Sequence, residues 1–172
     1  MKPSNHWDLI IIGAGLAGLT LARQMLLYSD KRILHLERLE RVPRERQKVG
    51  ESTVQVAGFH YGKVLDLEEY MHQEQLMQYN LRFSWPSAGD RNQYESYSHS
   101  YIRHFSNIPC YQLDRNRFER DLIEMNRRSE RYQLETGVAD IEPEINPDGA
   151  HSIRYKRKGQ DCHVTADWMV DS

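Results

Sequence analysis

The chain has 172 residues, of which 39% are hydrophobic and 28% charged, enough apolar material for one ordinary domain. Its net charge of -2 gives no electrostatic basis for binding nucleic acid or an anionic membrane surface. No apolar run approaches the roughly twenty residues that a membrane-spanning helix needs. The two cysteines lie far apart, and the histidines show no metal-ligand spacing. We therefore expect a cytoplasmic protein with no metal site, no membrane span and no nucleic-acid partner.

The strongest pattern lies in the first forty residues. An apolar strand is expected over 9–12, and a G-x-G-x-x-G turn and a helix to Tyr28 follow it. A second strand, expected over 33–37, ends in an acid about twenty positions after the last glycine. In such a βαβ unit the glycines allow a tight turn, close approach of a pyrophosphate and helix packing, and the acid accepts hydrogen bonds from a ribose. The residues of this candidate dinucleotide site are Gly13, Ala14, Gly15, Leu16, Ala17, Gly18 and Glu37. A tight turn in a nucleotide-free α/β protein, with Glu37 at a solvated strand end, is the alternative.

The middle of the chain gives weaker signals. The arginine-rich segment 38–48 is predicted to be a solvated connector rather than a phosphate clamp. Residues 49–53 predict a turn in which Ser52 or Thr53 caps a helix. Helical spacing then predicts a helix over 63–77, and strands are expected over 79–85 and 94–105 around a loop at 86–92. The aromatic side chains of these two strands either pack a sheet or wall a substrate pocket.

The last third of the chain alternates between one helix and several strands. Asp114 opens a helix, and a strand is expected over 132–141, followed by a turn at 142–150. Strands over 152–158 and 162–170, joined by a tight turn, predict an antiparallel hairpin. The fold class is therefore α/β, with a Rossmann-like parallel sheet, helices and an added hairpin. Because the final residues form a strand with no turn after it, we expect the N-terminal part of a longer polypeptide.

Four segments of the chain together resemble a known family. They are the glycine turn with Glu37-Arg38, then Lys48-Val49-Gly50-Glu51-Ser52-Thr53, then Gln112-Leu113-Asp114-Arg115-x-x-Phe118-Glu119-x-x-Leu122, and finally Trp168-Met169-Val170-Asp171-Ser172. This ordered set resembles the flavoprotein monooxygenase superfamily with the p-hydroxybenzoate hydroxylase fold. Within that superfamily it is most similar to the flavin-dependent halogenases and related FAD-dependent oxidoreductases.

The resemblance implies a Rossmann-like FAD-binding domain over residues 1–172, incomplete at its end, with 79–110 as the beginning of a substrate-side sheet. It implies an FAD-dependent oxidoreductase, acting on an aromatic or other electron-rich small molecule. Electrons would come from NAD(P)H or from a separate flavin reductase. Besides the glycine turn and Glu37, the residues that it places near FAD are Arg38, Gly50, Glu51, Ser52, Arg115, Val138 and Asp171.

Several alternatives remain open. The halogenases carry a lysine whose place here falls at Gln78, and no lysine occurs between Lys63 and Lys156, which counts against halogenation. A reductase or dehydrogenase of the geranylgeranyl-reductase type and a non-catalytic nucleotide-binding fragment are the alternative functions. Arg115 is alternatively a helix-start arginine paired with Asp114 or Glu119. Glu51 and Ser52 are alternatively a turn and a helix cap, and no residue is singled out as catalytic.

Overall fold

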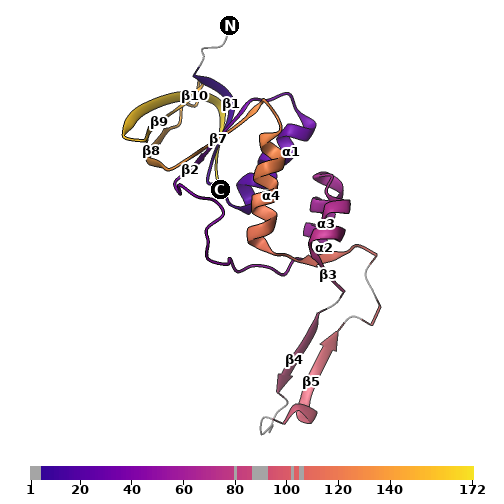
Figure 1. The fold of residues 1–172 in the computed structure, drawn as a ribbon. Coiled ribbons are helices and arrows are strands. Elements are labelled where there is room, and N and C mark those ends of the chain that lie inside the picture. Colours follow the sequence, from indigo (N-terminus) through magenta and orange to yellow (C-terminus); the bar gives the residue numbers. More distant parts are fainter. Residues whose placement is uncertain (1–4, 80, 87–92, 102, 105–106) are drawn as a thin grey trace. The chain divides into compact units, whose positions relative to one another are not determined.

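The computed structural model describes residues 5–79, 81–86, 93–101, 103–104 and 107–172 (Figure 1). The chain divides into two compact units. The first unit combines Met1–Gly50 with Asp114–Ser172, and the second consists of Glu51–Leu113. The second unit is thus an insertion in the sequence of the first.

A six-stranded sheet forms the centre of the first unit, in the order β7-β2-β1-β10-β9-β8. Neighbours among β7, β2, β1 and β10 are parallel, whereas β9 is antiparallel to both β10 and β8. The strands are β1 (His6–Ile12), β2 (Ile33–Glu37), β7 (Tyr132–Thr136), β8 (Val138–Glu144), β9 (His151–Arg157) and β10 (Gln160–Asp171). The predicted α/β class, with a parallel sheet and an antiparallel hairpin, is confirmed.

Two helices, α1 (Leu16–Tyr28) and α4 (Arg115–Arg127), pack against each other beside this sheet (Figure 1). Asn126 of α4 donates a hydrogen bond to the carbonyl of Leu19 in α1 at 3.1 Å. The side chains of successive β1 residues pack in different core clusters, because strand side chains alternate between the two faces of a sheet. Ile11 packs in the cluster that contains Ala22 of α1, and Ile10 in the cluster that contains Ile153 of β9. Burial on both faces explains the uninterrupted apolar run of β1.

The strand predicted over 132–141 is two strands in the structure. Gly137 has a φ of +70° and separates β7 from β8. This left-handed conformation, which glycine adopts without steric cost, lets the chain leave its parallel course and pair with β9 instead. The strand β8 then continues to Glu144, into the segment predicted to be a turn.

The second unit contains short elements. Its strands form two antiparallel pairs, β3 with β6 and β4 with β5. The elements are α2 (Gln55–Phe59), the π-helix η1 (His60–Val64), α3 (Glu68–Glu74), β3 (Leu76–Gln78), β4 (Arg82–Pro86), the 3-10 helix η2 (Tyr94–Ser96), β5 (Tyr97–Tyr101) and β6 (Cys110–Gln112).

Predictions for this unit need correction. The single helix over 63–77 is wrong, because Asp66 has a φ of 53° between η1 and α3 and Met77 lies in β3. The predicted cap is also wrong: Val54 precedes α2 and makes no side-chain cap bond. The strands expected over 79–85 and 94–105 correspond to the shorter β4 and β5. Parts of these predictions, including most of the loop at 86–92, lie outside the described residues.

Candidate functional site

The glycine turn connects the end of β1 to the start of α1. Gly13 has a φ of +99°, and its amide donates to the carbonyl of Leu36 in the neighbouring strand at 2.8 Å. A Cβ atom on Gly18 would lie 2.2 Å from the carbonyl oxygen of Gly13, so helix and turn approach too closely for any side chain there. A Cβ atom on Gly15 would have nothing within 4 Å. The fold thus requires glycine at positions 13 and 18, whereas the space in front of Gly15 is open.

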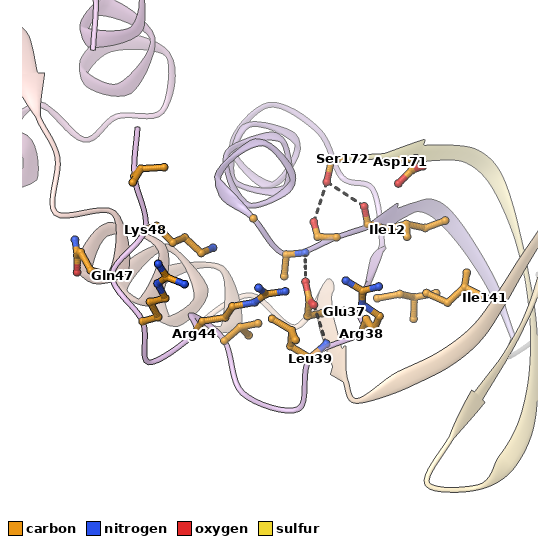
Figure 2. Close-up of a pocket in the computed structure, with 17 residues that line it drawn as sticks. Ile12, Glu37, Arg38, Leu39, Arg44, Gln47, Lys48, Ile141, Asp171 and Ser172 are labelled. Carbon is orange, nitrogen blue, oxygen red and sulfur yellow. Dashed lines mark hydrogen bonds between the residues drawn. The ribbon is translucent and has the colours of Figure 1, made fainter. Parts of the chain in front are cut away.

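Glu37, at the end of β2, bonds to the turn through its side chain. One carboxylate oxygen accepts a hydrogen bond from the amide of Ala14 at 2.7 Å, and the other accepts one from the amide of Leu39 at 2.8 Å (Figure 2). Each carboxylate oxygen has two lone pairs, so each retains one after these bonds. Glu37 therefore fixes the turn and can still accept hydrogen bonds from hydroxyl groups of a ligand.

His35, two residues before Glu37, is fully buried below the turn. Its Nε2 lies 2.8 Å from the carbonyl oxygen of Gly13, and its Nδ1 lies 2.9 Å from the hydroxyl oxygen of Tyr132 in β7. Burial lowers the pKa of His35; the hydrogen bond to Gly13 and the charge of Glu37 act in the opposite direction. No role for His35 was predicted from the sequence, because its partners, Gly13 in the turn and Tyr132 in β7, come from distant parts of the chain.

The turn and the end of β2 border a cavity of about 780 Å³ in the first unit (Figure 2). Its lining includes the cationic side chains Arg38, Arg44, Arg46 and Lys48, against the two acids Glu37 and Asp171. Apolar residues such as Leu39 and Ile141 complete parts of the wall. An excess of cations around a concave site favours an anionic ligand. The connector 38–48, predicted to be only a solvated link, thus contributes to the wall.

The first turns of α4 fix the end of this connector. Glu119 is fully buried and forms ion pairs with Lys48 and with Arg115, the latter at 2.6 Å. Arg115 also donates to the carbonyl oxygens of Val49 at 3.2 Å and Gly50 at 3.4 Å. Arg115 is not among the residues that line the cavity, so its contact with a phosphate stays a prediction, while its alternative pairing with Glu119 is present.

The structure gathers part of the predicted site in one place. Six of the predicted residues line the cavity: Gly13, Ala14, Gly15, Glu37, Arg38 and Asp171. Leu16, Ala17 and Gly18 form the start of α1, and Val138 is buried in a core cluster. The lining residues that sequence reasoning missed as ligand contacts include Leu39, Arg44, Arg46, Lys48, Ile141 and Ser172. For three of these residues, Arg44, Arg46 and Lys48, the available signal was the cluster of cations in the connector.

Glu51 and Ser52 belong to the second unit, where they pair with the segment around β6. The amide of Leu113 donates to the carbonyl of Glu51 at 2.7 Å, and Ser52 forms an isolated antiparallel β-bridge with Gln112. The Ser52 hydroxyl also lies 3.0 Å from the side-chain oxygen of Gln78. Gln78, the residue at the expected lysine position, is thus a neighbour of Ser52. The roles of Gly50, Glu51, Ser52 and Val138 toward FAD stay predictions.

Two kinds of feature are not found in the described ranges of the chain. Within those ranges, no three His, Cys, Asp or Glu side chains are grouped so that they could hold a metal ion. None of the helices within the same ranges is long and apolar enough to cross a membrane.

Comparison with known proteins gives one similar curated sequence and several similar structures. The flavin-dependent halogenase chlA of Dictyostelium discoideum is 38% identical over 128 residues, which cover 70% of this chain and 21% of the relative. The p-nitrophenol 4-monooxygenase PnpA of Pseudomonas putida DLL-E4 superimposes with a TM-score of 0.75 at 12% identity, over 98% of this chain and 41% of that one. The myxobacterial chondrochloren halogenase CndH, described as a variant of FAD-dependent halogenases, gives 0.72 at 21% identity, over 98% and 37%. No family model matches the chain.

These comparisons confirm the resemblance to flavin-dependent halogenases and monooxygenases and the fold that it implied. The chain spans about a fifth of the length of the curated relative and about two fifths of the structural ones. The low identity to the solved structures means that they establish the fold and not the activity.

Proposed function

We propose that the first unit binds FAD in the cavity beside the glycine turn and that the protein is a flavin-dependent oxidoreductase. The observation that carries the proposal is the open space in front of Gly15, next to a carboxylate with unused lone pairs. A glycine that the fold itself does not need is explained by a ligand that must approach its backbone. Two of the named relatives, the flavin-dependent halogenase chlA and the FAD-dependent halogenase CndH, support the same cofactor.

The residues present fit the cofactor chemically. The start of α1 presents backbone amides and the positive end of a helix dipole, which suit a diphosphate. Glu37 retains acceptor sites for the hydroxyl groups of a ribose. Arg38, Arg44 and Arg46 supply positive charge around the cavity. When bound, FAD would supply the redox chemistry with oxygen, and the protein would bind and orient it.

Within this class, the sequence favours oxygen transfer to an aromatic or other electron-rich substrate over halogenation. Gln78 occupies the position expected for the halogenase lysine, and a carboxamide carries no amine that could react with an oxidised halogen. Its hydrogen bond with Ser52 places this amide beside the segment 51–53 of the second unit. The electron donor, NAD(P)H or a separate flavin reductase, and the cytoplasmic location stay predictions.

Cofactor binding is tested by titrating the purified protein with FAD and following flavin fluorescence and absorbance. Saturable binding of one FAD per chain supports the proposal. Absence of binding by the wild-type chain contradicts it.

Activity is tested separately, by supplying reduced FAD, oxygen and a set of phenols and indoles with and without bromide. The expected product carries an added oxygen and is the same with or without halide. A brominated product would contradict the preference for oxygen transfer. If reduced flavin is oxidised without oxygen and an unsaturated substrate is hydrogenated, the reductase alternative is correct.

A further inference from the structure

We infer that His35 is a positioning residue for the phosphate-facing turn: its Nε2–H fixes the carbonyl of Gly13 and thereby the direction of the turn amides. The inference rests on the proposed function, since it concerns the FAD site. It adds a buried residue that does not itself line the cavity but bonds to Gly13, which does.

The partners of the imidazole determine which nitrogen carries the proton. A carbonyl oxygen can only accept, so Nε2, 2.8 Å from the oxygen of Gly13, is the protonated nitrogen. Nδ1 is then an acceptor, and the hydroxyl of Tyr132 donates to it at 2.9 Å. Burial is the largest influence on Tyr132 and raises the pKa of its hydroxyl, which therefore keeps its proton. Tyr132 thus selects the tautomer that can donate to Gly13.

The bond matters because the carbonyl of Gly13 and the amide of Ala14 belong to one rigid peptide group and point in opposite directions. His35 bonds to the oxygen of this group, and Glu37 bonds to its N–H. Glycine has little conformational preference of its own, so bonds from outside must hold the turn. Ser172 supplies a further donor to the same carbonyl at 2.8 Å. Gly18 provides the room for the ring, since a Cβ there would lie 2.9 Å from Nε2.

An apolar residue would be the simpler choice at this position for stability alone. The neighbours of His35 along β2, Leu34 and Leu36, are buried and apolar. Replacing both partners of a buried hydrogen bond by apolar groups of similar size is close to neutral for folding. His35 and Tyr132 can be replaced together in this way, and the carbonyl of Gly13 then keeps Ser172 as a donor. Stability and cofactor affinity can therefore be separated by substitution, and this separation tests the inference.

The test compares two substitutions at His35. In the first protein, His35→Leu is combined with Tyr132→Phe, which removes the donor to Gly13 and the hydroxyl that would otherwise lose its acceptor Nδ1. In the second, His35→Gln retains a donor and an acceptor, as the imidazole does. Tyr155→Phe is the matched control, because Tyr155 is also buried in this sheet but its hydroxyl donates to Glu135 at 2.8 Å. Thermal unfolding and the Kd for FAD are measured for each.

We expect the double variant to unfold near the wild-type temperature and to bind FAD about tenfold more weakly. We expect His35→Gln to stay within about threefold of the wild-type Kd, and Tyr155→Phe to leave the Kd unchanged. A folded double variant with wild-type affinity would overturn the inference, and so would equal losses of affinity in the double variant and in His35→Gln. If the wild-type chain binds no FAD, the proposed function fails. Nitrogen-15 NMR, which identifies the protonated ring nitrogen of His35, then still decides whether His35 holds the turn.

A second measurement needs neither a variant nor FAD. Nitrogen-15 NMR of the histidine side chains distinguishes a protonated Nε2 from a protonated Nδ1. For a neutral His35, these contacts require the proton on Nε2 and a hydrogen-bonded Nδ1. A proton on Nδ1 in the folded, unprotonated ring would overturn the inference.

Discussion

His35 and Glu37 bond to opposite ends of one peptide group, the one that joins Gly13 to Ala14. The two residues are separated by a single position in β2, so their side chains leave the strand on the same side. One is buried in the core and the other lies at the cavity. A single short strand thereby determines both the conformation of the turn and the acceptor that faces the ligand.

Gly15→Val is expected to abolish FAD binding while the protein remains folded. No atom lies within 4 Å of a Cβ at Gly15, and this residue has no positive φ, so the substitution should strain nothing in the free protein. The new side chain would, however, occupy the space where the pyrophosphate must approach the backbone. Fluorescence titration with FAD measures the loss, and circular dichroism measures the fold.

The control for this substitution is Gln24→Val, which places the same β-branched residue further along α1. It should bind FAD as the wild type does, with at most the small loss of stability expected from helix propensity. Stoichiometric flavin in purified Gly15→Val would refute the position of the pyrophosphate.

Glu37→Gln is expected to weaken FAD binding by about 1–3 kcal/mol, through loss of charge-assisted hydrogen bonds. The carboxylate accepts two backbone amides, whereas a carboxamide would turn its NH₂ group toward one of these donors. Part of the effect should therefore appear as lower stability of the free protein. Comparing Kd and unfolding temperature with those of Glu40→Gln, an exposed acid three residues later, separates the local effect from a change in net charge. An unchanged Kd in Glu37→Gln would exclude its contact with the ribose.

The part of the site that could be predicted from sequence is the part set by neighbouring residues. The glycine turn, the two strands around it and the acid after β2 lie within about thirty positions, and each has its own local signal. Asp114 was likewise predicted to open a helix, and its side chain accepts the amide of Arg117 at 3.0 Å.

The remainder depends on contacts between distant segments. Nothing near His35 in sequence indicates Tyr132 as a partner, and the wall formed by Arg44, Arg46 and Lys48 depends on bonds to α4, some seventy residues later. The division of a predicted helix at Asp66 and of a predicted strand at Gly137 required single residues in left-handed conformations. Apolar periodicity does not signal such residues.

Glu119→Gln is expected to lower the free energy of unfolding by about 3 kcal/mol. The fully buried carboxylate pairs with two cations, so its neutral analogue leaves both without a counter-ion. The side chain of Lys48 is 28% exposed and regains water, which keeps the loss at the lower end of the usual range. Urea unfolding measures the change. Glu124→Gln, at an exposed position of the same helix, should change stability by less than about 0.5 kcal/mol, and an equal effect of both substitutions would contradict the buried pairing.

His35 should also make stability depend on pH. Burial lowers its pKa in the folded protein below the usual value of 6.5, whereas the unfolded chain titrates near that value. Between the two pKa values the unfolded state binds more protons. The contribution of His35 is therefore complete above pH 6.5 and is lost as the pH falls through the folded pKa.

The slope from this one group is at most about 1.4 kcal/mol per pH unit. Since other histidines and the acids titrate over the same range, the informative quantity is the difference between two proteins. Urea unfolding from pH 7 to pH 5 should show a steeper loss of stability in the wild type than in the His35→Leu, Tyr132→Phe protein. These two proteins share every other titratable group in this range, because tyrosine stays neutral throughout it. Parallel curves would mean that His35 is charged to the same extent in both states, which is incompatible with a buried imidazole between a hydroxyl and a carbonyl.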